Sequence, residues 1–279
     1  MSQITVHGGK PLVGRVDVKG AKNLVTKAMV AALLGESASV LKDVPFISDV
    51  EIVSRLLQLH GVVIEHAADG VMTLDPTKVS SARMADIDAH AGSSRIPILF
   101  CGPLLHRLGE AFIPGLGGCH IGDRPIDFHF EVLRNFGAVI EELENGTRLS
   151  APKGLHCAKI KLQYPTVGAP EQVLLTAVRA EGLTELSGAA IEPEIMDLIA
   201  ILQKMGAIIS VEPNRVIVIE GVEKLEVDGS ASSLRIDVRY PQQNGGWFGW
   251  GGDDTGPSVL EVTIPAGACL DVDTVSADV

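Results

Sequence analysis

The chain has 279 residues, of which 46% are hydrophobic, and a formal net charge of −12 at pH 7. This length allows two domains of ordinary size with an ample core, and the acidic balance excludes an extended nucleic-acid surface, which needs a basic field. No apolar run reaches the roughly 18 residues needed to cross a bilayer, and the start lacks the apolar core of a signal peptide. Four cysteines show no metal-ligand spacing. We therefore expect a cytoplasmic, reduced protein without a metal site.

A helix-strand-helix-strand unit begins near residue 20 and recurs twice, at a period of about seventy residues. The first copy opens with an Ala/Leu-rich helical pattern that ends at Gly35. An amphipathic pattern then ends at Gly61, before a β-branched stretch and a polar turn at 68–70. Because the apolar spacing changes from helical to strand-like after each glycine, we expect left-handed C-caps at these glycines and a hairpin around the turn.

The second copy repeats this order, with glycines at Gly109 and Gly137 and a turn at 144–146. Within it, Cys119 lies in a glycine-rich run, and Arg124 follows five residues later. Glycines let a backbone approach a ligand closely, and a guanidinium both favours a thiolate and anchors a bound anion. The run therefore indicates a reactive thiol on a loop. The alternative is a small buried cysteine beside an ordinary turn.

The third copy has its glycines at Gly182 and Gly206 and its turn at 212–214. At about residue 226 a Gly/Ser stretch marks a boundary. The segment 226–279 contains both tryptophans and alternating strand patterns, and it resembles the strand repeats of bacterial putative adhesin domains. We expect an unrelated β-rich tail that either pairs with an edge of the preceding domain or stays partly mobile. Self-association through this tail is a further expectation, and we interpret the chain as a chimera or a misjoined reading frame.

Three such units, with Lys22 and Asn23 opening the first and Cys119 in the second, resemble the enolpyruvyl transferases. Among these enzymes, the three units resemble the subfamily that transfers the enolpyruvyl group of phosphoenolpyruvate to the 3-hydroxyl of UDP-N-acetylglucosamine and releases phosphate. The resemblance covers residues 1–225. It implies an α/β fold, an inside-out α/β barrel of three repeats over 20–225, with 1–19 as the first piece of another domain. It also implies no cofactor, and a cytoplasmic role in peptidoglycan synthesis, cell shape and division as a fosfomycin target.

The resemblance also implies the site. Cys119 is the expected general acid, able to form a covalent adduct, while Lys22 and Arg124 contact phosphoenolpyruvate. Arg95 matches a second anion-binding arginine, although the Gly-Ser-Ser run before it departs from the family's Met-Arg-Ala-Ser pattern. The segment 125–129 is expected to cradle the uracil, with Asp127 as the uridine contact, and the segment 164–168 is expected to meet the uracil and the diphosphate. The substrate-binding residues implied in this way are Asn23, Arg95, Pro125, Ile126, Asp127, Phe128, Thr166, Val167 and Gly168.

Three functions stay open. In this family the general base, and the arginines that hold the phosphoenolpyruvate carboxylate, come from the other domain, and the tail offers no match for them. The chain is therefore expected to encode part of a transferase site, alone or with a separate second half. The alternatives are a catalytically inactive nucleotide-sugar-binding fragment and a non-enzymatic surface module led by the tail. The related shikimate-phosphate transferases share the fold but lack the cysteine, so Cys119 discriminates against them.

Overall fold

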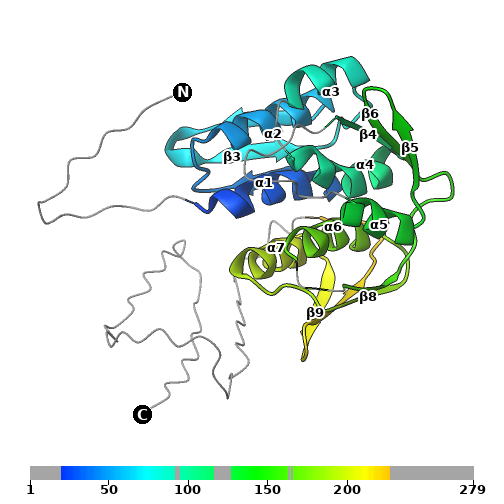
Figure 1. Cartoon of the computed structure of the whole chain (residues 1–279). Helices are drawn as coiled ribbons and strands as arrows, with labels where there is room; N and C mark the ends of the chain where they lie inside the picture. The colour runs from blue at the N-terminus through cyan, green and yellow to red at the C-terminus, as the bar shows by residue number, and fades with distance from the viewer. Residues whose placement is uncertain (1–19, 92–94, 116–126, 163, 165, 227–279) are drawn as a thin grey trace, which may run out of the picture.

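The computed structural model describes residues 20–91, 95–115, 127–162, 164 and 166–226. Each predicted copy contains a pair of helices within these residues (Figure 1). A further short helix, α3, links the first copy to the second and was not predicted. The helices are α1 (Lys22–Ala31), continued by the 3-10 turn η1 (Ala32–Leu34); α2 (Ser48–Leu59); η2 (Ala68–Gly70); α3 (Met84–Ala91); η3 (Ile96–Phe100), continued by α4 (Cys101–Leu108); α5 (Asp127–Asn135); α6 (Gly168–Ala177); and α7 (Pro193–Lys204).

Three sheets accompany the helix pairs, and all three predicted hairpins are present. In each sheet the second strand of the hairpin lies in the middle, antiparallel to both neighbours. The third sheet gains an unpredicted strand, β7, which pairs parallel with β8. In spatial order the sheets are β1 (Ser39–Leu41), β3 (Met72–Asp75) and β2 (Val63–His66); β4 (Glu110–Pro114), β6 (Gly146–Ser150) and β5 (Val139–Leu143); and β7 (Lys159–Lys161), β8 (Leu183–Ser187), β10 (Val216–Glu220) and β9 (Ile208–Glu212).

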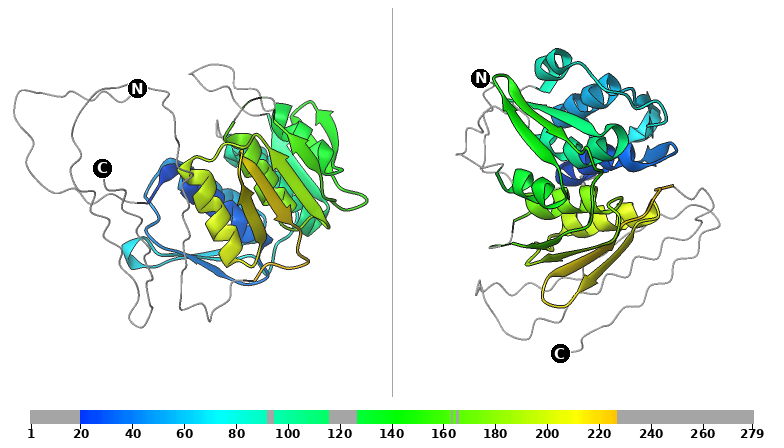
Figure 2. Two further views of the ribbon diagram at one scale, coloured as in Figure 1. Left: turned by 90° about the horizontal axis from the view of Figure 1, so that it is seen from below. Right: turned by 90° about the vertical axis from the view of Figure 1, so that its right-hand side faces the viewer.

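The first helix of each pair is buried more completely than the second. Every residue of α6 from Ala169 to Ala177 is buried, as are the residues of α4 from Cys101 to Leu105. A helix that is apolar on all sides belongs in the interior, whereas an amphipathic one covers a core. In α2, α5 and α7 burial is confined to one stripe. Figures 1 and 2 show the corresponding layers, with the sheet of β8 and β9 outside α6 and α7.

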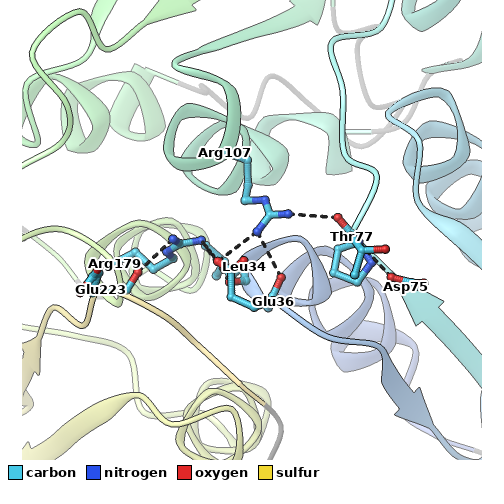
Figure 3. Close-up of polar contacts among 9 residues, drawn as sticks. Leu34, Glu36, Asp75, Thr77, Arg107, Arg179 and Glu223 are labelled. Atoms are coloured by element: carbon cyan, nitrogen blue, oxygen red, sulfur yellow. Dashed lines mark hydrogen bonds and ion pairs between the residues drawn. The ribbon is translucent and has the colours of Figure 1, made fainter.

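The three inner helices run in the same direction. In the first two units α1 contacts η3 and η1 contacts α4, so the helix starts lie together and the helix ends lie together, and α4 also packs against α6. At the C-terminal ends of these helices, the carboxylate of Glu36 forms ion pairs of 3.1 Å with both Arg107 and Arg179 (Figure 3). Arg179 also donates to the carbonyl of Leu34 (3.4 Å), at the end of the first helix. Cations are favourable at helix C-termini. Because the three helices are parallel and their C-terminal ends meet here, their N-termini lie together at the opposite end of the core.

The predicted left-handed caps are confirmed at Gly61, Gly109, Gly137 and Gly206. Gly182 is not a helix cap, because it lies five residues beyond Ala177, the last residue of α6, and Gly35 is not left-handed. Gly35 has φ −76° and ψ 155°, an extended conformation. It forms a parallel bridge with Leu225, and the N–H of Glu36 donates to the Leu225 carbonyl at 2.9 Å. Contact with the end of the third unit therefore holds this residue extended. The other five glycines have positive φ: Gly61 (85°), Gly109 (73°), Gly137 (94°), Gly182 (101°) and Gly206 (97°).

Candidate functional site

The predicted site residues within the described ranges lie at the starts of helices. Lys22 and Asn23, which open the first unit, are the first two residues of α1. Arg95 directly precedes η3 and is half-buried, and Thr166 and Val167 lead into α6, which begins at Gly168. Asp127 and Phe128 begin α5. The remaining predicted residues, Cys119, Arg124, Pro125 and Ile126, lie outside the described residues.

The starts of α1 and α6 leave backbone donors for a ligand. The residues that precede them are Ala21 and Val167, and neither makes a side-chain cap hydrogen bond within the described part of the chain. The first N–H groups of a helix have no partner inside it, and the helix dipole places partial positive charge there. Such an end attracts phosphate and carboxylate groups. Three parallel helices that start together therefore offer one anion-attracting surface, with the cations Lys22 and Arg95 on it.

Lys22 is held in place by an aspartate that sequence reasoning missed. Its Nζ lies 3.0 Å from Oδ2 of Asp49, in the first turn of α2. The lysine side chain is 67% exposed, so the pair adds little to stability. Its effect is to direct the ammonium group while leaving it accessible to a ligand. The available sequence signal was an acidic residue in the first turn of a predicted helix, which is common at any helix start.

A groove of about 290 Å³ lies between α5, the end of β7 and the segment that leads into α6. Three predicted residues, Asp127, Phe128 and Thr166, line it together. It combines aromatic and apolar surface with charged and amide groups, the usual mixture in a ligand site. Tyr164, which belongs to the segment expected to hold the diphosphate, also lines the groove, whereas Glu131, Asn135 and Lys161 were not predicted.

One wall of the groove rests on a buried histidine. The ring of Phe128 stacks on the ring of His129, with centroids 4.5 Å apart. Burial lowers the pKa of His129 to about 4, against a smaller opposing effect of Gln172. The imidazole is therefore neutral at pH 7 and packs as an apolar support for Phe128. Gly168 allows this packing, because a Cβ there would lie 3.1 Å from Nε2 of His129 and 3.2 Å from Cε2 of Phe128.

No group of three or more His, Cys, Asp and Glu side chains within the described ranges is arranged to hold a metal ion. None of the helices in this part of the chain is long and apolar enough to cross a membrane.

Comparison with known proteins gives close relatives by sequence. The UDP-N-acetylglucosamine 1-carboxyvinyltransferase of Protochlamydia amoebophila (strain UWE25) is 40% identical over 245 residues, which are 85% of this chain and 52% of that protein. The protein of the same name from Acidiphilium cryptum (strain JF-5) is 43% identical over 226 residues, 81% of this chain and 53% of that protein. The chain thus spans about half the length of the curated relatives that it matches.

Solved structures share the fold. The enolpyruvyl transferase NikO from Streptomyces tendae superposes with a TM-score of 0.68 at 22% identity, covering 79% of this chain and 51% of that one. EPSP synthase from Acinetobacter baumannii gives a TM-score of 0.62 at 20% identity, covering 78% of this chain and 50% of that one. A family model described as EPSP synthase (3-phosphoshikimate 1-carboxyvinyltransferase) matches residues 6–233. The resemblance to enolpyruvyl transferases is therefore confirmed, and the chain belongs to the EPSP synthase family.

Proposed function

We propose that the chain forms one wall of the active site of a UDP-N-acetylglucosamine 1-carboxyvinyltransferase. The reaction moves the enolpyruvyl group of phosphoenolpyruvate to the 3-hydroxyl of the sugar, releases phosphate and begins peptidoglycan synthesis. The observation that carries the proposal is the common end of the three inner helices, where Lys22, Asn23, Arg95 and Gly168 all lie at helix starts. Relatives of that name, about 40% identical over most of the chain, narrow the substrate class.

Both substrates are anions, and the chain places its cations accordingly. Lys22 and Arg95 serve the phosphoenolpyruvate side, where a guanidinium binds phosphate with two parallel hydrogen bonds at any working pH. Asn23, the next residue along α1, can both donate to and accept from the reacting hydroxyl. Among the residues that the structure does not describe, we assign Cys119 as the acid that protonates the methylene carbon and Arg124 as a phosphate ligand.

The groove beside α5 suits the nucleotide end of the sugar. Asp127 accepts hydrogen bonds from the uracil and Phe128 packs on its ring, while Pro125 and Ile126 complete the cradle. Thr166, Val167 and the N–H of Gly168 face the diphosphate, since a helix start attracts phosphate groups. The supporting observation is that Asp127, Phe128 and Thr166 line one groove although they come from two separate segments.

The proposal includes an architecture and a location. Residues 20–225 constitute one inside-out α/β barrel domain of three repeats, and 1–19 belong to a second domain that completes the cleft. Three sheets with the same strand order, outside three buried helices, support the repeat. The tail from 226 is assigned to neither domain. Both substrates are cytoplasmic metabolites in this scheme, and we place the protein in the cytoplasm.

A second candidate function is binding of the nucleotide sugar without turnover. It is favoured by one observation, that the chain spans about half the length of its curated relatives. A single wall of a cleft can bind a ligand, but it excludes water poorly and positions a second substrate poorly, and both contribute strongly to catalysis.

A steady-state phosphate-release assay with both substrates separates the two functions. We expect the 279-residue chain, assayed alone, to release phosphate at least about a hundredfold more slowly than a full-length relative, because loss of the general base alone costs about 10²–10⁴ in rate. Addition of a polypeptide that carries the second half of a relative should restore release. Turnover by the chain alone at the rate of the full-length enzyme would contradict this division of the site.

A further inference from the structure

A buried ion pair joins α1 to α6 near the end of the core that carries the proposed site. Nζ of Lys27 lies 3.3 Å from Oε1 of Glu171, and the two side chains are only 16% and 8% exposed. Lys27 is in the second turn of α1, and Glu171 is in the first turn of α6. A third helix, α7, packs against both and brings Glu194 close to Glu171. The pair is therefore enclosed by three helices.

The pair lies about one helical turn beneath the proposed ligand contacts. Asn23 and Lys27 are four residues apart in α1, so they share a face of that helix, and Gly168 and Glu171 share a face of α6 in the same way. One turn of an α-helix rises about 5.4 Å. Asn23, on the sugar side, therefore lies about one turn from Lys27. Gly168, on the diphosphate side, lies about one turn from Glu171.

Stability alone does not account for this pair. Removing two charges from water costs about as much as their attraction returns, so apolar residues of similar volume would stabilise the core at least as well. Burial raises the pKa of Glu171, Lys27 opposes this rise, and Glu194 adds to it. Ala28 and Val173 nearby in the two helices are buried and apolar, whereas Thr26 and Gln172 are buried and polar but uncharged. An ion pair differs from apolar contact in being directional, so it fixes the spacing between two particular points.

We infer that Lys27 and Glu171 are positioning residues, whose contact sets the distance between Asn23 and the start of α6 so that the sugar and the diphosphate of one ligand are held together. The inference rests on the proposed function, and it adds two residues that touch no substrate. The charged and titratable groups that face Glu171 are Lys27 from α1 and Glu194 from α7.

The double variant Lys27→Met/Glu171→Leu tests the inference, because it removes both charges and keeps the volume. We expect its melting temperature to stay near that of the wild type, while its affinity for UDP-N-acetylglucosamine, measured by calorimetry, falls about tenfold to a hundredfold. Without ligand, hydrogen exchange should become faster at the amides of residues 25 and 171, which donate to the carbonyls of Ala21 and Val167 at the two helix starts. Lys27→Arg keeps the ion pair and should bind as the wild type does.

Glu36→Gln is the matched control, since it weakens the half-buried cluster with Arg107 and Arg179 at the opposite end of the same helices. It should lower the melting temperature and leave the affinity unchanged. If the wild type binds the nucleotide sugar and the double variant binds it equally well, or if exchange at the two helix starts is unchanged, the positioning role is wrong while the proposed function stands. Absence of binding by the wild-type chain would overturn both.

Discussion

Gly221→Ala should lower the free energy of unfolding by at least about 3 kcal/mol, at the upper end for an overpacked site. Gly221 follows β10, and its N–H donates to the carbonyl of Gly182 at 2.9 Å. A Cβ at this position would overlap the carbonyl group of Ala180 and lie 3.2 Å from its nitrogen. Ala180 is fully buried, and the next residue, Val222, donates to Val178 at 2.9 Å. Neither backbone segment can move without breaking the contact of β10 with the end of α6.

Urea unfolding followed by circular dichroism measures this loss. Gly115→Ala is the matched control, because no heavy atom of the described residues lies within 4 Å of the added methyl group, and it should change the free energy of unfolding by less than about 0.5 kcal/mol. An equal loss of unfolding free energy in the two variants would mean that the close approach of Gly221 to Ala180 does not exclude a side chain at position 221.

Acidification from pH 6.5 to pH 4.5 should destabilise the fold by several kcal/mol. Burial lowers the pKa of His106 and of His129 from the ordinary 6.5 to about 4. As the pH falls below 6.5 the unfolded chain takes up protons at these residues and the folded chain does not, so stability is lost as the pH falls toward 4. One pH unit corresponds to about 1.4 kcal/mol for each group, which gives roughly 5 kcal/mol for both over this window.

Unfolding free energies at pH 7.0, 5.5 and 4.5 test the sign and the size of this effect. The variant His129→Gln should have a shallower decline than the wild type between pH 6.5 and 4.5, whatever its stability at pH 7. The same slope in both proteins would show that His129 is not held neutral by burial.

Local patterns predicted the units of the fold well. The change of apolar spacing after Gly61, Gly137 and Gly206 depends on neighbouring residues alone, and each glycine has the positive φ that it requires. The left-handed cap predicted at Gly35 was wrong, because a contact with Leu225, far along the chain, decides the conformation of this residue. The strand β7 was missed because three residues carry little periodicity and its partner β8 is not adjacent in sequence. The short helix α3 was also missed, because its sequence mixes Asp, His and apolar residues.

The site depended more on the resemblance than on the residues themselves. Lys22 alone is typical of a solvated surface charge, and a turn explains Thr166 and Gly168 equally well. Their association requires that helices about seventy residues apart run in parallel with their starts together, and this is set by packing rather than by any local signal. Asp49, Lys27 and Glu171 were missed for the same reason, since ion pairs between helices leave no spacing in the sequence.

The central claim is that the common end of the three inner helices receives the nucleotide sugar. Titration of the isotopically labelled chain with UDP-N-acetylglucosamine, followed by the NMR shifts of its backbone amides, tests this most directly. We expect saturable shifts at Asn23, Phe128 and Gly168, and unchanged resonance positions for Glu36 and Arg179 at the other end. Absence of saturable shifts, or shifts confined to the end with Glu36 and Arg179, would contradict it.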